Sequence, residues 1–235
     1  MRIYYDIETN PSREYVDRVL LELEKVDYQQ EHFDYMQTLK EGGAARKREE
    51  EIHEKTNWDE KTDEILAEKI EERLATAALH WTTGQVVCAT IRTMGQEFTW
   101  EGDDEKKILN MLAFELNNFW VPETSVLIGK HAEQFDRPFL IGRYMANDLG
   151  VPDMLRFPGN VTDVEHIWGK YNKHKPGKLG DIAVALGLEG KLAKGSNVRD
   201  MVENEQWAEL AAYNQQDVRL CEQIFARYDK KWTGQ

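Results

Sequence analysis

The sequence predicts an α/β fold: a mixed five-stranded sheet with helices on both faces, plus a long helical insertion after the first strand. Short apolar runs that suit strands alternate with longer segments whose apolar residues recur at helical spacing. Some seventy residues of helical and charged sequence separate the first two expected strands. With 235 residues, 41% of them hydrophobic, the chain is long enough for one sizeable domain and an elaboration.

The first expected strand carries the most informative pair of residues. The apolar run of residues 3–5 leads directly into residues 6–9, where Asp6 and Glu8 lie two positions apart. Because side chains alternate along a strand, both carboxylates point the same way. Two neighbouring carboxylates repel each other, and the usual ion between them is a hard divalent cation. Alone, the pair could also be two solvated acids on an edge strand.

Residues 11–80 are expected to form the insertion, a helical hairpin or small helical subdomain. Asn10 is expected to cap the first helix and Pro11 to be its first residue. Residues 42–43 are both Gly and break the pattern, and residues 44–55 are highly charged. A second helix is expected from about Asp59 to residue 78. The remainder, residues 1–10 and 81–235, is expected to form the main domain.

The sequence alone does not distinguish among several roles for the insertion. It could be a solvated stabilising elaboration, a clamp that guides a nucleic-acid strand into the site, or a docking surface for a replication partner. A charged helix pair also has coiled-coil character, which would allow self-association.

The other strands follow from short apolar runs bounded by turn residues. A turn at residues 94–96 joins the second and third strands, and Asp103 or Asp104 can cap the helix that follows. Asp163 lies in the last strand and is expected to support the acidic cluster. These strands are expected at residues 85–91, 97–100, 126–129 and 161–164.

Two further segments contribute acids to the same region. A buried strand at residues 126–129 runs into a new helix near Asp136, so Asp136 lies at the strand-to-helix crossing. Near the C-terminus, apolar residues recur at helical spacing, and Tyr213 and Asp217 are four positions apart on one side of that helix. Each has a structural alternative: Asp136 could only cap its helix, Tyr213 could only pack, and Asp217 could lie on the helix surface.

Taken together, these segments resemble the DEDD superfamily of 3′–5′ exonucleases in its tyrosine-containing branch (DEDDy). The residues 178–188 are similar to the helix that precedes the third motif in exonuclease domains of family B DNA polymerases. The resemblance covers about residues 1–10 and 82–230, and it departs from the family at residues 130–132, where His-Asn is more common. The three family motifs appear in order as Asp6 with Glu8, as Asp136, and as Tyr213 with Asp217.

The resemblance implies a ribonuclease H-like fold and a two-metal site for phosphodiester hydrolysis. Asp6 would contact both cations, Glu8 and Asp217 would complete the first ion's protein ligands, and Asp136 would support the second, through water if not directly. All-oxygen ligation favours Mg²⁺ or Mn²⁺. In related enzymes the position of Tyr213 orients the attacking water, as a hydrogen-bond partner.

The formal charge of −13 does not exclude nucleic acid as a partner, because acidity is concentrated in the metal site and in residues 40–73. Residues 170–178 form a basic loop with an aromatic ring, a composition that suits phosphates and an unpaired base. Its structural alternative is a solvated loop. We expect nucleic-acid contacts from His131 and from the loop residues Lys170, Tyr171, Lys173, Lys175 and Lys178.

Composition also indicates the compartment. Cys88 and Cys221 lie in apolar contexts without metal-ligand spacing, so we expect buried free thiols. No apolar stretch approaches ~18 residues, and the N-terminus lacks the pattern of a signal peptide. These observations predict a cytoplasmic protein without a membrane partner.

The sequence therefore predicts a metal-dependent 3′–5′ exonuclease that acts on DNA at single-stranded or frayed 3′ ends and releases nucleoside 5′-monophosphates. A 3′–5′ exoribonuclease is the nearest alternative, since no residue identifies a contact to the 2′-OH. A nucleic-acid-binding or replisome module without turnover is the alternative from another class.

Overall fold

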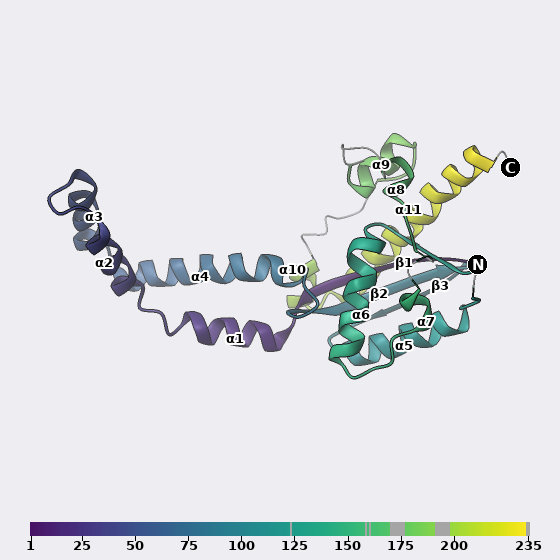
Figure 1. Cartoon of the computed structure of the whole chain (residues 1–235), viewed down its shortest axis with the longest axis horizontal. Coiled ribbons are helices and arrows are strands. Elements are labelled where there is room, and N and C mark those ends of the chain that lie inside the picture. Colours follow the sequence, from purple (N-terminus) through teal and green to yellow (C-terminus); the bar gives the residue numbers. More distant parts are fainter. Residues whose placement is uncertain (123, 158, 160, 170–176, 191–197, 234–235) are drawn as a thin grey trace. The chain divides into compact units, whose positions relative to one another are not determined.

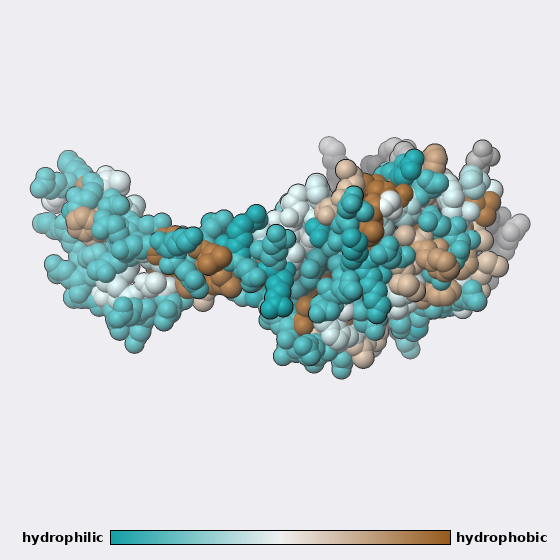
Figure 2. Space-filling model, turned by 90° about the horizontal axis from the view of Figure 1, so that it is seen from below, coloured by the Kyte–Doolittle hydropathy of each residue, from teal (hydrophilic) through white to brown (hydrophobic). Residues whose placement is uncertain are grey.

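The structure is a computed structural model that describes the chain except residues 123, 158, 160, 170–176, 191–197 and 234–235. It divides into two units, which we describe separately: residues 1–10 with 78–235, and residues 11–77. Figure 2 shows that hydrophilic residues cover much of the visible surface of both units, interrupted by small hydrophobic patches. None of the described helices is both long and apolar enough to cross a membrane.

The first unit contains a five-stranded sheet in the order β3-β2-β1-β4-β5. β2 and β3 pair antiparallel, whereas β1 pairs parallel with β4, and β4 with β5. This mixed arrangement confirms the predicted sheet and is consistent with a ribonuclease H-like fold. The strands are β1 (Arg2–Pro11), β2 (Gly84–Thr93), β3 (Gln96–Glu101), β4 (Val126–Gly129) and β5 (Val161–Asp163).

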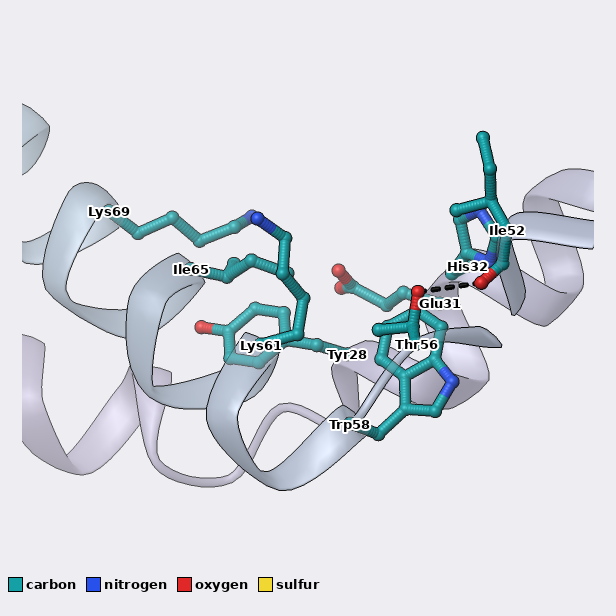
Figure 3. Close-up of a pocket in the computed structure, with 9 residues that line it drawn as sticks. All are labelled: Tyr28, Glu31, His32, Ile52, Thr56, Trp58, Lys61, Ile65 and Lys69. Carbon is teal, nitrogen blue, oxygen red and sulfur yellow. Dashed lines mark hydrogen bonds between the residues drawn. The ribbon is translucent and has the colours of Figure 1, made fainter. Parts of the chain in front are cut away.

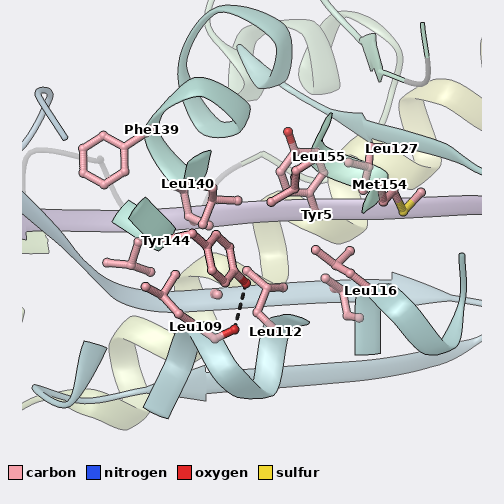
Figure 4. Packing of buried hydrophobic residues seen from close by; sticks show 14 of the residues in the cluster. Tyr5, Leu109, Leu112, Leu116, Leu127, Phe139, Leu140, Tyr144, Met154 and Leu155 are labelled. Carbon is pink, nitrogen blue, oxygen red and sulfur yellow. Dashed lines mark hydrogen bonds between the residues drawn. The ribbon is translucent and has the colours of Figure 1, made fainter. Parts of the chain in front are cut away.

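Helices cover both faces of this sheet (Figure 1). One face packs against α5 (Glu105–Asn118), α6 (Arg137–Ala146) and α7 (Asp153–Arg156), whose apolar side chains form the largest core (Figure 4). The other face packs against α9 (Leu179–Ala185), α10 (Val198–Glu203) and α11 (Trp207–Thr233). The short α8 (His166–Gly169) follows β5.

Alternation along β1 decides where its acids point. Ile3, Tyr5 and Ile7 are buried in the core under α5 and α6, whereas Tyr4 is buried in the cluster formed with α9 and α11. Because residues two apart share a face of a strand, Asp6 and Glu8 belong to the α11 side with Tyr4. The hydrophobic pattern of β1 thus directs both carboxylates towards the last helix.

The local signals between β2 and α5 are confirmed. Met94 (φ 51°) and Gly95 (φ 78°) both have positive φ at the two-residue turn of the hairpin, as a type I′ turn requires. Asp104, one of the two expected caps, accepts a hydrogen bond of 3.0 Å from the amide of Lys107. Hairpin and cap together set the path of the chain from the sheet into α5.

A buried ionic network ties α5 to α6. Glu105 is only 7% exposed. Its carboxylate accepts hydrogen bonds from the amide of Val86 (2.7 Å), from two nitrogens of Arg143 (2.8 and 2.6 Å) and from Asn147 (2.8 Å). Arg143 also donates to the carbonyl of Trp81 (2.7 Å). These contacts hold the chain where it enters β2.

We expect Glu105→Ala to destabilise the first unit by about 2–3 kcal/mol, because it leaves the partly buried Arg143 guanidinium and the buried Val86 amide without their acceptor. Unfolding by urea, followed by circular dichroism, measures the loss. Glu115→Ala on the same helix is the matched control, since the Glu115 carboxylate accepts only a long bond of 3.5 Å from Asn118. Equal effects of the two substitutions would contradict a special role for the network.

The second unit is helical and differs in detail from the expected hairpin. It contains four helices: α1 (Arg13–Leu23), α2 (Tyr28–Thr38), α3 (Ala44–Lys55) and α4 (Trp58–Ala77). α4 corresponds to the second expected helix, whereas residues 44–55, expected only as a charged segment, form α3. α1 packs against α4, and α2 packs against both α3 and α4.

The start of α1 also corrects a prediction. β1 continues through Asn10 to Pro11, so these residues are neither cap nor first turn of the helix. Ser12 is the N-cap, and its hydroxyl accepts a hydrogen bond of 3.3 Å from the amide of Tyr15. Asn and Ser are about equally good caps, so local preference did not distinguish them.

Candidate active site

Three carboxylates from two distant parts of the chain converge on the α11 face of the sheet. Asp6 and Glu8 come from β1, and Asp217 comes from α11. One carboxylate oxygen of each lies within 4.8 Å of those of the other two. Asp217 is 5% exposed, whereas Asp6 and Glu8 are half-buried. The face of β1 that carries Asp6 and Glu8 therefore meets the side of α11 that carries Asp217.

Two more residues of α11 hold this cluster. Asn214, fully buried, donates through Nδ2 to Asp6 Oδ2 (2.8 Å) and, more weakly, to Glu8 Oε1 (3.5 Å). The hydroxyl of Tyr213 is hydrogen-bonded to the Asp217 carboxylate. Asn214 was not singled out from the sequence, although it lies inside the Tyr-x-x-x-Asp motif, because nothing local indicates that its amide faces β1.

The phenol of Tyr213 stays protonated in this environment. Burial raises the pKa of its hydroxyl well above the ordinary value of 10, and the charges of Glu8, Asp217 and Asp6 raise it further. A phenol surrounded by carboxylates loses its proton with difficulty because a further negative charge would be repelled. Tyr213 can therefore donate a hydrogen bond but is a poor base.

Asp136 is buried beside this cluster but is not one of its three closely spaced carboxylates. It ends a turn of π-helix (Ala132–Asp136) that leads into α6, and its side chain makes no capping bond. Burial raises the pKa of its carboxyl well above the usual range, and the charges of Glu8 and Asp163 add to this. The helix-capping alternative is thus not supported.

Two buried oxygens suggest what the site accommodates. Oδ2 of Asp136 and Oδ1 of Asn214 have no hydrogen-bond partner within the described part of the chain. Buried polar atoms are seldom left unsatisfied, and carboxylate and amide oxygens are ligands for hard cations. The acids at this site could therefore hold a metal ion, which would also offset their mutual repulsion.

A second polar group lies between the loop after β4 and the turn after β5. Glu165 pairs with Lys130 Nζ and with His131 Nδ1, each at 3.1 Å. Buried Asp163 is close enough for its carboxylate, Glu165 and His131 to be within 4.8 Å of one another. His131 has a left-handed backbone (φ 58°). Lys130 and Glu165 were not predicted, because only the parallel pairing of β4 with β5 brings them together.

The expected nucleic-acid contacts are only partly described. His131 is half-exposed beside Glu165. Lys178 is exposed directly before α9. The other four predicted residues, Lys170, Tyr171, Lys173 and Lys175, lie outside the described residues.

Comparison with known proteins gives similarity at the level of fold. No model of a known protein family matches this chain, and no curated protein matches it. Among solved structures it is similar to the family B DNA polymerase from the hyperthermophilic archaeon Pyrobaculum calidifontis, with a TM-score of 0.53 and 20% identity. The match covers 62% of this chain and 22% of that polymerase.

Proposed function

We propose that this protein is a metal-dependent 3′–5′ exonuclease that acts on DNA and releases nucleoside 5′-monophosphates. The convergence of Asp6, Glu8 and Asp217, close to buried Asp136, carries this proposal. Two similarities support it. Three ordered sequence motifs resemble DEDDy exonucleases, and the fold is similar to a family B DNA polymerase.

The acids would hold two divalent cations, Mg²⁺ or Mn²⁺, because the donor set consists of oxygen atoms. Asp6 would contact both ions, Glu8 and Asp217 would complete the protein ligands of one, and Asp136 would support the other. Bound cations of this kind activate a water molecule and stabilise the leaving oxygen in phosphodiester hydrolysis.

The protein's own residues would position the reactants. Tyr213, protonated and hydrogen-bonded to Asp217, would hold the attacking water by a hydrogen bond. Asn214 would keep Asp6 and Glu8 in place through its amide. Water oxygen bonds to phosphorus, the bond to the 3′-oxygen breaks, and that oxygen takes up a proton, so the product is a nucleoside 5′-monophosphate.

DNA is the proposed substrate because residues 178–188 resemble exonuclease domains of family B DNA polymerases and the fold is similar to one such polymerase. A site that binds the terminal nucleotide in an extended strand favours single-stranded or frayed 3′ ends. Lys178 and His131 are the described residues that could contact its phosphates.

End-labelled substrates test this proposal directly. With Mg²⁺, we expect a 5′-labelled single strand of DNA to shorten stepwise and a 3′-labelled one to release its label as a mononucleotide at the earliest times. EDTA should stop both reactions. Single-stranded RNA of the same sequence, assayed in parallel, should be degraded more slowly.

Each other outcome assigns a different function. Faster degradation of RNA would replace the proposal with an exoribonuclease. Release of the 3′ label on oligonucleotides instead of on a mononucleotide would indicate endonuclease activity. Strand binding without turnover at any Mg²⁺ or Mn²⁺ concentration would leave a binding module.

A further inference from the structure

The helical unit of residues 11–77 contains a cavity of about 330 Å³. Residues from α2, α3 and α4, and from the link between α3 and α4, line it (Figure 3). Cavities of this size are at the lower end of the range for small-molecule sites. The cavity lies within one unit, and nothing in the proposed exonuclease reaction uses it.

The cavity is lined in part by the aromatic residues Tyr28, His32 and Trp58. Tyr28 is 4% exposed, and its hydroxyl donates to the carbonyl of Leu23 (3.3 Å). The ring of His32 stacks on that of His53 (centroids 5.3 Å apart, planes 7° apart) and is tilted against Trp58 (5.2 Å). Rigid ring faces of this kind suit a planar aromatic ligand.

The polar atoms of His32 are already used inside the unit. Its Nε2 lies 3.1 Å from Glu49 Oε2 and its Nδ1 lies 3.1 Å from His53 Nδ1. The imidazole nitrogens are therefore already occupied and do not serve to bind a ligand. Recognition of polar groups on a ligand falls to the charged side chains at the opening.

Those side chains are two cations and one anion. Lys61 and Lys69 extend from α4 on the side of the Tyr28 ring, and Glu31 projects from α2 (Figure 3). The ammonium of Lys69 lies 5.3 Å from the centroid of that ring. Lys61 pairs with Glu64 (2.8 Å), but the two side chains are 48% and 69% exposed, so this pair costs little to open. Two ammonium groups suit a phosphate, and a carboxylate suits an amino group.

We propose that this cavity binds a nucleoside 5′-monophosphate. The base would pack against Trp58, its exocyclic amino group would donate to Glu31, and the phosphate would contact Lys61 and Lys69. The choice of a nucleotide over other anionic aromatic molecules rests on the proposed function, since that reaction releases such nucleotides.

Net charge favours the free nucleotide over a nucleotide unit of a DNA strand. Residues 11–77 contain 19 acidic and 11 basic residues, a net charge of −8. Repulsion by this charge grows with every phosphate that a strand carries. A mononucleotide brings only one phosphate, which the two lysines can neutralise.

Calorimetric titration of the full-length chain in EDTA tests the proposal, first with wild type and then with the Asp6→Ala, Glu8→Ala variant. We expect saturable binding of dAMP to both. Deoxyadenosine, without phosphate, should bind about tenfold more weakly. dTMP should also bind more weakly because thymine has no exocyclic amino group.

Substitutions at the cavity opening avoid the buried aromatic residues. Lys69→Gln should weaken dAMP binding about tenfold and leave deoxyadenosine binding unchanged. Glu31→Gln should reduce the preference for dAMP over dTMP. Lys47→Gln, an exposed substitution on α3 away from the cavity, is the matched control and should change neither. Circular dichroism verifies that each variant keeps its helices.

Either of two results would overturn the proposal: no saturation with dAMP into the low millimolar range, or equal losses from Lys69→Gln and Lys47→Gln. Because binding is measured without cations and without two site carboxylates, a negative result would not bear on exonuclease activity. Conversely, an inactive protein that binds dAMP would remove the exonuclease proposal and leave the cavity assignment standing.

Discussion

Asp6→Ala is expected to abolish DNA hydrolysis while the fold remains intact. Asp6 is the carboxylate proposed to contact both cations, and cations at such sites contribute several kcal/mol to the transition state. The rate should therefore fall by about 10³-fold or more. The measurement is release of 3′-terminal nucleotides from labelled single-stranded DNA, with enzyme purified free of contaminating nuclease.

Stability provides the internal control for this variant. Asp6 is half-buried and is not part of the apolar core. Its removal also relieves repulsion from Glu8 and Asp217, so the melting temperature without metal should stay the same or rise. Asp103→Ala, which removes an exposed acid before α5, should leave activity unchanged. Wild-type turnover by the Asp6→Ala, Glu8→Ala variant would show that the proposed site is wrong.

Tyr213→Phe is expected to lower kcat by about 10–10³-fold, the range for a group that positions or transfers a proton. The substitution keeps the buried ring and removes only the hydroxyl that is hydrogen-bonded to Asp217. Binding of DNA should barely change, since the ring's packing persists. Single-turnover rates with saturating enzyme separate the chemical step from binding.

Tyr228→Phe is the matched control for this prediction. It makes the same chemical change on the same helix, 15 residues further along, or about 22 Å at the rise of an α-helix. Its rate should equal that of wild type. If Tyr213→Phe also kept the wild-type single-turnover rate across the pH range, the phenol would be structural only.

The regular elements of the main unit could be predicted closely because their signals are local. The apolar run at residues 85–91 and the alternating residues 97–100 correspond to β2 and β3, and the turn at Met94 and Gly95 joins them. The helices of the second unit, residues 11–77, were harder to predict. Residues 44–55 are so highly charged that no apolar stripe indicated α3, which has no buried residues of its own.

At the candidate site, too, features within one element could be predicted from the sequence, whereas contacts between elements could not. The spacing of Asp6 with Glu8, and of Tyr213 with Asp217, placed each pair on one face of its own element. No local pattern indicates that Asn214 reaches both strand acids or that Glu165 pairs with Lys130 and His131. Those contacts join side chains from different elements, and their partners depend on how strands and helices pack.

By itself, then, the sequence determined the strands of the main unit, the acids and the phenol at the candidate site, and the face of its own element on which each lies, since these follow from periodicities of two and 3.6 residues. The tertiary structure alone decided that Asp6, Glu8 and Asp217 meet, that Asp136 is buried beside them, and that the pKa of Tyr213 is raised. Distances, burial and electrostatic fields arise from atoms far apart in the chain, so only the folded arrangement sets them.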